Sequence, residues 1–310
     1  MDKIASIVGI QVFVMFALIV MGYILTKTGM VSKKGASDMS GILLTLVTPC
    51  VLIRTYQTEL DLNSVRGLVY AFISSVAIHV ILIALSALYF CGVKDEEKRK
   101  IDRFSGIYSN CGFMAIPLLH AAFGNSGVFY GSAYLAVFNL LSWSHGIHMY
   151  AGKGEKLSVK TMIFNPGIIG TVIALALYFL QIKLPSPLLS VVNYTADLNT
   201  PLAMILLGSF LARTNIISTF KNLQIYAVAL FRLILSPVAA IILFKILKID
   251  QSIAIAILIS ASCPTATLAA LFAEKFDMNS SYGSQISAIT TLYSIVTIPL
   301  MVGLAGLFIK

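Results

Sequence analysis

Small polar residues gather at the middle of two apolar segments, residues 107–123 and 257–276. A proline lies close to them in each segment. The residues concerned are Ser109, Asn110, Cys111, Gly112 and Pro117 in the first segment, and Ser262, Cys263, Pro264, Thr265 and Thr267 in the second. A lipid bilayer offers no partner to a free backbone group, so a broken helix persists there only beside protein or water. Two such breaks predict a binding site inside a membrane protein.

The chemistry that these residues favour is anion binding. Proline has no N–H and is best tolerated in the first turn of a helix. A helix starting at Pro264 would be capped by Ser262 or Cys263, and its positive end would lie at mid-membrane. In the first segment the Asn110 amide can donate to a carboxylate or accept from a cation. The alternative is a proline kink whose Ser and Thr side chains bond to the preceding turn. We favour that alternative for either segment alone and the binding site for the pair.

Charged residues inside apolar segments are costly and are functional hypotheses. Arg232 lies in the middle of residues 223–247, where it could pair with a substrate carboxylate, bond to the carbonyl groups of a broken helix, or extend to the membrane surface. Arg54 is expected to anchor a span at the membrane boundary. Asp197 is expected to cap the following span or to meet Arg54. Asn139 is expected to face the two breaks.

His145 and His148 are three residues apart, a spacing compatible with a metal site. No acidic or cysteine partner lies near them in the sequence, so a metal site is disfavoured, whereas a proton relay through histidine stays possible. No acidic residue adjoins either break, which weakens a sodium-coupled mechanism. No P-loop is present to bind ATP. We expect no cofactor, and coupling to H⁺ or Na⁺ stays open.

The composition indicates a polytopic α-helical membrane protein. Hydrophobic residues make up 58% of the 310 positions and charged residues 11%, and the mean hydropathy is +0.91. The net charge of +9 is assigned to cytoplasmic loops rather than to a nucleic-acid surface. The four cysteines lie in apolar segments without paired spacing, and we interpret them as core residues: Cys50, Cys91, Cys111 and Cys263.

The apolar runs predict ten membrane spans. The spans are expected at about 4–26, 37–58, 65–91, 104–123, 128–150, 165–181, 198–212, 223–247, 252–273 and 284–309, with a turn at 124–127 between the fourth and the fifth. Loops that follow odd-numbered spans carry 14 lysines and arginines, and the other side carries 7. By the positive-inside rule both termini are then extracytoplasmic, in the plasma (inner) membrane.

The two halves look like an inverted repeat. Pro49 and Pro201 each follow a threonine and are 152 residues apart, and Pro117 and Pro264 are 147 apart. Five spans per copy is an odd number, so the copies would insert with opposite orientation. Chance is the alternative, because prolines are common in membrane helices. The predicted repeats are residues 1–151 and 152–310.

Four stretches carry a resemblance to a known family. They are SNCGFMAIPLLHAAFG at 109–124, ASCPTATLAALFAEKF at 261–276, TPCVLI at 48–53 and TPLAMILLGSFLA at 200–212. Over essentially its whole length the chain resembles the auxin efflux carrier family, specifically its bacterial malate/malonate permease-like members.

The resemblance implies a ten-helix bundle like that of sodium/proton antiporters and bile-acid symporters. It implies that the fourth and ninth spans unwind and cross at Pro117 and Pro264. It also implies a dimerising scaffold, residues 4–62 and 161–214, and a mobile transport domain, residues 63–151 and 221–310. The implied substrates are small organic anions: auxin in plants, and malate or malonate in bacteria.

The leading hypothesis is therefore a secondary transporter or facilitator for a small organic anion, working by elevator-type alternating access, and not an enzyme. A sodium-coupled symporter of the bile-acid type is the first alternative. A membrane-embedded enzyme that uses His145 and His148, or a sensor, is more remote. The expected partners are the lipid bilayer, the anion and a second copy of the chain, with no nucleic acid.

Overall fold

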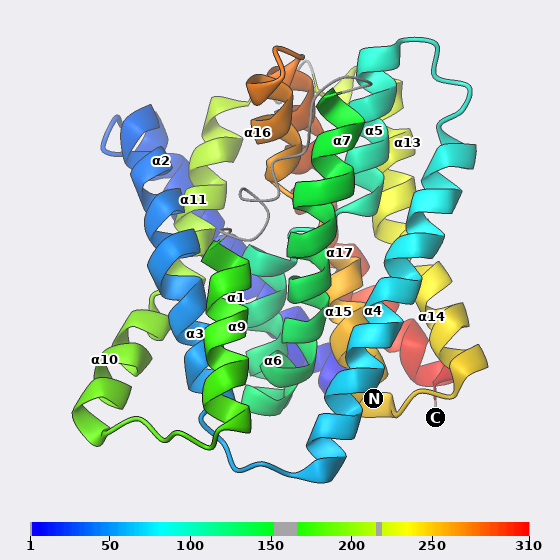
Figure 1. The fold of residues 1–310 in the computed structure, drawn as a ribbon. Coiled ribbons are helices and arrows are strands. Elements are labelled where there is room, and N and C mark those ends of the chain that lie inside the picture. Colours follow the sequence, from blue (N-terminus) through cyan, green and yellow to red (C-terminus); the bar gives the residue numbers. More distant parts are fainter. Residues whose placement is uncertain (1, 152–165, 215–218, 310) are drawn as a thin grey trace.

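The protein is a bundle of helices. A computed structural model describes residues 2–151, 166–214 and 219–309, and all regular elements in these ranges are helical. Figure 1 shows both chain ends at the lower end of the bundle. The predicted basic loop 153–160, the boundary between the predicted repeats at 151/152 and the predicted start of the sixth span lie outside the described residues.

The first half of the chain forms long helices joined by short π-helical turns. In order these are α1 (Asp2–Lys27), α2 (Lys33–Ile42), turn η1 (Leu43–Val47), α3 (Thr48–Tyr56), α4 (Leu62–Tyr89), α5 (Glu96–Ile107), turn η2 (Cys111–Ala115), α6 (Ile116–Leu141), turn η3 (Ser142–Gly146) and α7 (Ile147–Ala151).

The described part of the second half is also helical and contains one π-helical turn. It contains α9 (Pro166–Phe179), α10 (Ser186–Asp197), α11 (Asn199–Arg213), α13 (Leu223–Leu230), turn η4 (Phe231–Leu235), α14 (Ser236–Leu247), α15 (Gln251–Ser262), α16 (Leu268–Lys275) and α17 (Ser280–Phe308).

Seven helical stretches in the described residues are long and apolar enough to cross a membrane, where the sequence predicts ten spans. They are Ile4–Lys27, Lys33–Tyr56, Leu62–Tyr89, Cys111–Ala151, Ser186–Arg213, Leu223–Leu247 and Ser280–Phe308. Pro166–Phe179 and Gln251–Ser262 are apolar but shorter. One difference has a local cause: the predicted fourth and fifth spans fall largely in the single stretch Cys111–Ala151.

The predicted turn at 124–127 coincides with a kink at Gly124, where two helical segments of α6 meet. Gly124 has φ +62° and ψ −146°, a conformation open to glycine because it has no Cβ. Gly124 itself is not helical, and the chain changes direction there between two helical segments. The bend lies at the lower end of the bundle, close to the pocket described below.

Three prolines explain three of the π-helical turns. Pro49, Pro117 and Pro237 each occupy the first turn of the α-helix that follows a π-helical turn. Proline cannot donate to the carbonyl four residues earlier and its ring collides with that carbonyl, so the turn before it widens. The wider turn absorbs the proline, and the helix continues through it.

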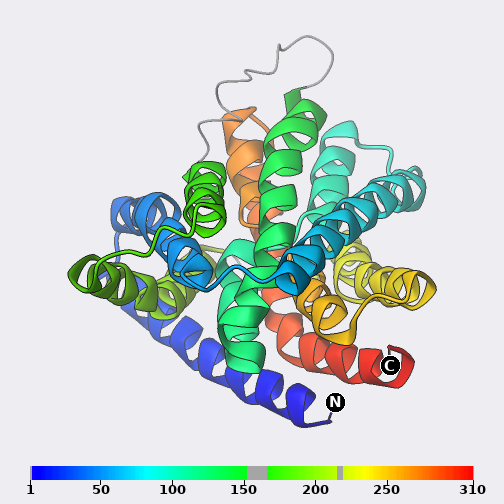
Figure 2. The ribbon, with the colours of Figure 1, turned by 60° about the horizontal axis from the view of Figure 1, so that its bottom comes forward.

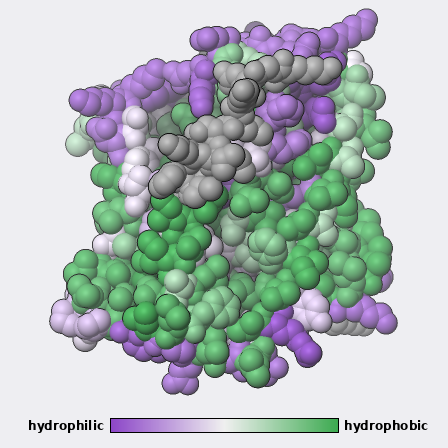
Figure 3. All heavy atoms as spheres, in the orientation of Figure 1, coloured by the Kyte–Doolittle hydropathy of each residue, from purple (hydrophilic) through white to green (hydrophobic). Residues whose placement is uncertain are grey.

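An apolar belt surrounds the bundle. In Figure 3 hydrophobic residues cover the middle of the molecule, and hydrophilic residues gather at the upper and lower ends. Large apolar side chains such as Phe13, Val296 and Leu307 are exposed. Exposed apolar surface of this extent indicates contact with lipid, so the chain is a multi-pass membrane protein.

The helices group around α6. In Figure 1, α2, α3, α9, α10 and α11 lie on one side of it, and α4, α5, α13 and α14 lie on the other. Figure 2 shows α1 running beside α17, which it contacts. The α1–α11 contact is especially close, because Gly22 lies against the backbone of Ile205 and Gly208 against that of Ile19. Small residues allow such close approach between membrane helices.

Candidate functional site

Two interrupted helices meet at the centre of the bundle. Helix α5 ends at Ile107 and η2 begins at Cys111, while α15 ends at Ser262 and α16 begins at Leu268. The non-helical segments 108–110 and 263–267 pair with each other through an antiparallel bridge. The N–H of Asn110 donates to the Pro264 carbonyl at 2.7 Å, and the N–H of Ala266 donates to the Tyr108 carbonyl at 3.0 Å. Each segment thus supplies partners for the backbone groups that the other helix leaves free.

The position of the first interruption corrects the prediction. The resemblance implies a crossing at Pro117, but Pro117 lies in the first turn of α6, seven residues after Asn110. The interruption overlaps the predicted polar cluster that begins at Ser109. The bridge joins Ser109 to Thr265, so the counterpart of Pro264 lies at Tyr108–Asn110 and not at Pro117. The physical reason is the π-helical turn η2, which accommodates Pro117 without a break.

The start of the second half-helix also differs from the prediction. We expected a helix from Pro264 capped by Ser262 or Cys263; instead Ser262 ends α15, and Thr267 directly precedes α16. Thr265 lies in the bridge itself. Its N–H donates to Thr290 Oγ1 at 3.2 Å and its hydroxyl donates to the Ser105 carbonyl at 3.0 Å.

Arg232 holds the two interrupted helices together. It is fully buried, and its Nη1 donates to the carbonyls of Gly106 and Ile107 at 3.0 and 2.8 Å. Its Nη2 donates to the Ala261 carbonyl. These carbonyls are the unpaired, partly negative C-terminal ends of α5 and α15. Of the interpretations that the sequence left open, this geometry matches bonding to broken-helix carbonyls.

The N-terminal ends at the crossing keep free donors. The first N–H groups of a helix have no partner within it, and here they belong to η2, which opens with Cys111 and Gly112, and to α16. Asn110 is 5% exposed, and its Nδ2 has no hydrogen-bond partner. Ser262 Oγ is likewise buried and unpaired. With the carbonyl ends neutralised by Arg232, these donors give the crossing a positive local character.

Helix α6 lines the crossing, but through residues that we did not single out. Ser109 donates to the Tyr134 hydroxyl at 3.4 Å, and the Tyr134 ring packs on His79 with centroids 4.7 Å apart. Asn139 is buried five residues further along α6. Its carbonyl accepts from Ser142 at 3.4 Å, and no hydrogen bond joins its side chain to the described residues of the bridge. Tyr134 carries no sequence signal, because tyrosine is common in membrane helices.

His145 bonds to the crossing rather than to His148. Its Nδ1 lies 2.9 Å from the hydroxyl of Tyr108, which also donates to the Leu141 carbonyl at 3.0 Å. Among the described residues no group of three or more His, Cys, Asp or Glu side chains is placed to hold a metal ion.

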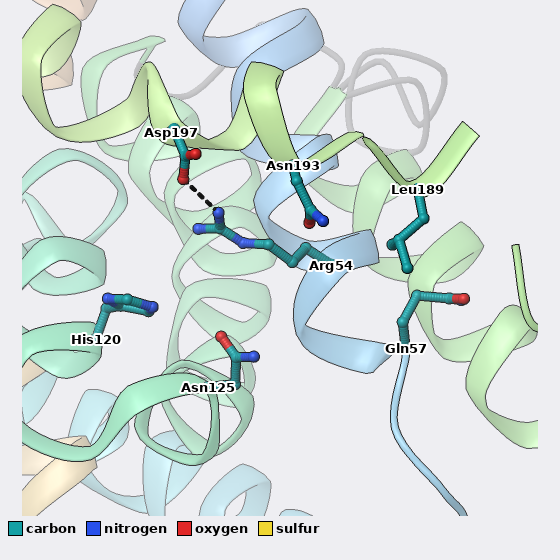
Figure 4. A pocket seen from close by; sticks show the side chains of 7 residues that line it. All are labelled: Arg54, Gln57, His120, Asn125, Leu189, Asn193 and Asp197. Carbon is teal, nitrogen blue, oxygen red and sulfur yellow. Dashed lines mark hydrogen bonds and ion pairs between the residues drawn. The ribbon is translucent and has the colours of Figure 1, made fainter. Parts of the chain in front are cut away.

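A polar pocket opens at the lower end of the bundle, between α3, α6 and α10 (Figure 4). Its volume is about 470 Å³. The predicted meeting of Arg54 with Asp197 is confirmed there, with Nη1 and Oδ1 2.6 Å apart. The lining residues are Arg54, Gln57, His120, Asn125, Leu189, Asn193 and Asp197.

A second cavity of about 230 Å³ adjoins this pocket and shares Arg54, His120 and Asp197 with it. It is also lined by Pro117, so this residue faces a cavity although it does not mark the break. Asn199, at the start of α11, lines the cavity as well; it is 3% exposed, and neither its Oδ1 nor its Nδ2 has a partner. The sequence marked His120 only as one of four histidines that could relay a proton, and it offered no reason to select Asn199.

Comparison with known proteins gives a consistent result. The family described as "Membrane transport protein" matches residues 7–162 and 157–302. An uncharacterized transporter of Methanocaldococcus jannaschii is 24% identical over 301 residues, which cover 93% of this chain and 96% of that protein. An uncharacterized transporter of Methanothermobacter thermautotrophicus is 23% identical over 299 residues, covering 91% and 93%.

Proposed function

Given that the chain belongs to the membrane transport protein family, that of the auxin efflux carriers, and is a membrane transporter, we propose that it carries a small organic anion as a secondary transporter or facilitator. The proposed substrates are carboxylates such as malate, malonate or an auxin-like acid. The proposed location is the plasma (inner) membrane, with both termini extracytoplasmic.

One observation carries the preference for an anion: Arg232 bonds to the carbonyl ends of both interrupted helices. A bound cation would need those carbonyls as ligands. The guanidinium of Arg232 already occupies them, and its positive charge repels a cation. The Asn110 amide, whose Nδ2 has no partner, remains to donate to a negative group beside the N-terminal ends of η2 and α16. An anion would therefore find donors at the crossing, whereas Na⁺ would find its best ligands taken.

We further propose ten spans arranged as two inverted five-helix repeats, residues 1–151 and 152–310. The seven long stretches would be completed by α9, by α15 with α16, and by α5 with η2 and the start of α6. The reciprocal hydrogen bonds at the crossing support this arrangement, since Tyr108–Asn110 and Pro264–Ala266 play equivalent parts in them. Equivalent backbone roles are expected of two copies related by a two-fold axis.

Transport would follow an elevator-type mechanism. Residues 4–62 and 161–214 would form a scaffold that dimerises, and residues 63–151 and 221–310 a domain that moves against it. The grouping of α2, α3, α9, α10 and α11 apart from α4, α5, α13 and α14 is compatible with that division (Figure 1).

The test is uptake into proteoliposomes of radiolabelled malonate, malate and indole-3-acetate, each under a proton gradient, a sodium gradient and no gradient. We expect uptake of at least one of these anions. Asn110→Ala should lower it about tenfold or more, because a hydrogen bond to a charged group is lost. Asn63→Ala, on the exposed start of α4, is the matched control and should leave uptake unchanged.

Sodium-dependent uptake would add sodium coupling to the proposal. Uptake unaffected by Asn110→Ala would remove the crossing as the substrate site. No flux of any of the three anions under any gradient would reject transport of this substrate class.

A further inference from the structure

The pocket at the lower end of the bundle has the composition of a ligand site. Six of the seven side chains that line it are polar, in a chain that is 58% hydrophobic. We propose that it binds the carboxylate of the transported anion, with Arg54 as the anchor. Asp197 is the internal anion that the carboxylate replaces, and Asn199 binds a second polar group of the same molecule. The proposal rests on the proposed function and adds a recognition site distinct from the helix crossing.

Arg54 has donors to spare. A guanidinium offers five N–H donors, and only Nη1 is engaged, with Asp197 Oδ1. Its Nε is buried without a partner. The guanidinium points into the pocket from α3 (Figure 4). Arginine binds carboxylates in a two-pronged geometry, which the remaining donors permit.

Asp197, the ion-pair partner of Arg54, is only weakly fixed in place. The Asp197 side chain is 68% exposed, against 20% for Arg54. An exposed carboxylate loses little when it turns from an ion pair to water. An incoming carboxylate can therefore replace Asp197 at Arg54 without leaving a buried charge unpaired.

Other free groups face the same space. His120 and Asn125 come from α6 and Asn193 from α10, and no hydrogen bond engages the side chains of these three described residues (Figure 4). The bend at Gly124 brings Asn125 to the pocket. Gln57 is different: its amide donates to the Ile182 carbonyl at 3.2 Å and accepts from the Leu184 N–H at 2.8 Å, so it fixes the loop at the rim.

Asn199 points to a second contact. Buried polar groups nearly always have partners, and both amide atoms of Asn199 lack one while lining the inner cavity. A hydroxyl, carbonyl or second carboxyl group of a ligand held at Arg54 would supply it. The two cavities share Arg54 and His120, and the inner one reaches Pro117, two residues beyond η2. A ligand held there lies on the approach from the lower surface to the crossing.

The site therefore selects a small anion with a carboxylate and a further polar group a few atoms away. The outer pocket of about 470 Å³ falls within the range of small-molecule sites, about 300–1,000 Å³. A dicarboxylate satisfies both contacts, whereas acetate satisfies only the one at Arg54.

The test is calorimetric titration of the purified full-length protein with malonate and with acetate. We expect Arg54→Gln to weaken malonate binding tenfold or more. Asp197→Asn should tighten binding of both probes several-fold, because the competing internal anion is gone. Asn199→Leu should weaken malonate and leave acetate unchanged. Arg66→Gln removes an exposed arginine near the start of α4 and is the matched control for lost charge.

The opposite signs of Arg54→Gln and Asp197→Asn distinguish a binding site from a structural ion pair. If the pair is only structural, both variants lower the melting temperature and neither tightens malonate binding, which overturns the proposal. Absence of binding of either probe to the wild type and to Asp197→Asn overturns it as well.

The proposed function can fail separately. Uptake that persists unchanged in Arg54→Gln would reject this site and leave anion transport standing. Binding with the expected pattern, but no flux of any anion into proteoliposomes, would support the site and reject transport of this class.

Discussion

Ser109 and Thr265 are 156 positions apart in the chain and face each other in an antiparallel bridge at the centre of the bundle. Their neighbours exchange two backbone hydrogen bonds, Asn110 to Pro264 and Ala266 to Tyr108. In a membrane the unpaired backbone of an interrupted helix is costly. The bridge makes each interruption the partner of the other, so the two breaks stabilise one another.

Arg232 is expected to be essential for stability rather than for affinity alone. Arg232→Met leaves the buried carbonyls of Gly106, Ile107 and Ala261 without their donor, at about 1–3 kcal/mol each. We expect the free energy of unfolding in detergent to fall by several kcal/mol, with Arg232→Lys intermediate. Arg99→Met, which removes a bond from Arg99 to the Val93 carbonyl near the surface, should cost about 1 kcal/mol or less. Equal losses in Arg232→Met and Arg99→Met would contradict this role.

Thr290 is expected to support the bridge from α17. Its Oγ1 accepts from the Thr265 N–H at 3.2 Å. Thr290→Val keeps the shape and leaves that N–H unpaired, so unfolding should become easier by about 1–3 kcal/mol, whereas Thr290→Ser should be close to wild type. Thermal unfolding of both variants provides the check, and a Val variant as stable as the Ser variant would show that the contact is dispensable.

Asp102 is a fully buried carboxylate in α5. Its Oδ1 accepts from the Tyr282 hydroxyl at 2.7 Å and its Oδ2 from Gln224 Nε2 at 2.8 Å, which ties α5 to α13 and α17. Asp102→Ala leaves both donors without an acceptor and should lower the free energy of unfolding by about 2–4 kcal/mol. Asp102→Asn keeps one acceptor and should lower it by less. Denaturant unfolding measures both. If Ala is tolerated as well as Asn, these hydrogen bonds do not hold the three helices.

Tyr56 joins the two groups of helices that the proposed mechanism separates. Its hydroxyl lies 2.6 Å from that of Ser132, a contact between α3 and α6. Tyr56→Phe removes this hydrogen bond and destabilises the observed packing of α3 on α6 by about 0.5–1.5 kcal/mol. The population of the other state of the proposed elevator should then rise by roughly two- to tenfold. Cysteine labelling of Asn110→Cys from each side of the membrane detects the shift, with Tyr194→Phe, at an exposed position on α10, as the control. Labelling that does not change would argue against movement of α6 relative to α3.

Asp61 is expected to make the start of α4 sensitive to acid. The backbone N–H of Ser64 donates to its Oδ2 at 2.8 Å and the Ser64 hydroxyl at 3.0 Å, which lowers the pKa of Asp61 below its ordinary value. The pKa of Asp61 is lower in the folded protein than in the unfolded chain. The ionised cap therefore stabilises the folded protein at pH values above the unfolded pKa. This contribution to stability is lost as the pH falls through the folded pKa.

Asp61→Asn caps without a titratable group. The wild type should therefore melt at a higher temperature than Asp61→Asn near neutral pH. This difference in melting temperature should shrink on acidification. A difference that stays constant across that range would show that Asp61 does not act as a charged cap.

Much of this protein was decided by local sequence. Continuous apolar runs specify membrane helices whatever their neighbours, because the bilayer acts on each segment separately, and the matches at α1, α4, α14 and α17 follow from that. The polar clusters around Ser109 and Thr265 were also visible, since polar groups inside apolar runs need partners. The contact between Arg54 and Asp197 was predicted, because opposite charges near a membrane boundary attract each other.

Tertiary structure alone decided where the first helix is interrupted and what the groups around it do. The family resemblance implies a crossing at Pro117; the break lies at Tyr108–Asn110, because that is where a segment 156 residues away supplies the missing hydrogen bonds. The partners of Arg232 and the convergence of Arg54, His120 and Asn199 on adjoining cavities likewise depend on which helices pack together. Helix packing depends on contacts between distant residues, and neither periodicity nor composition records them.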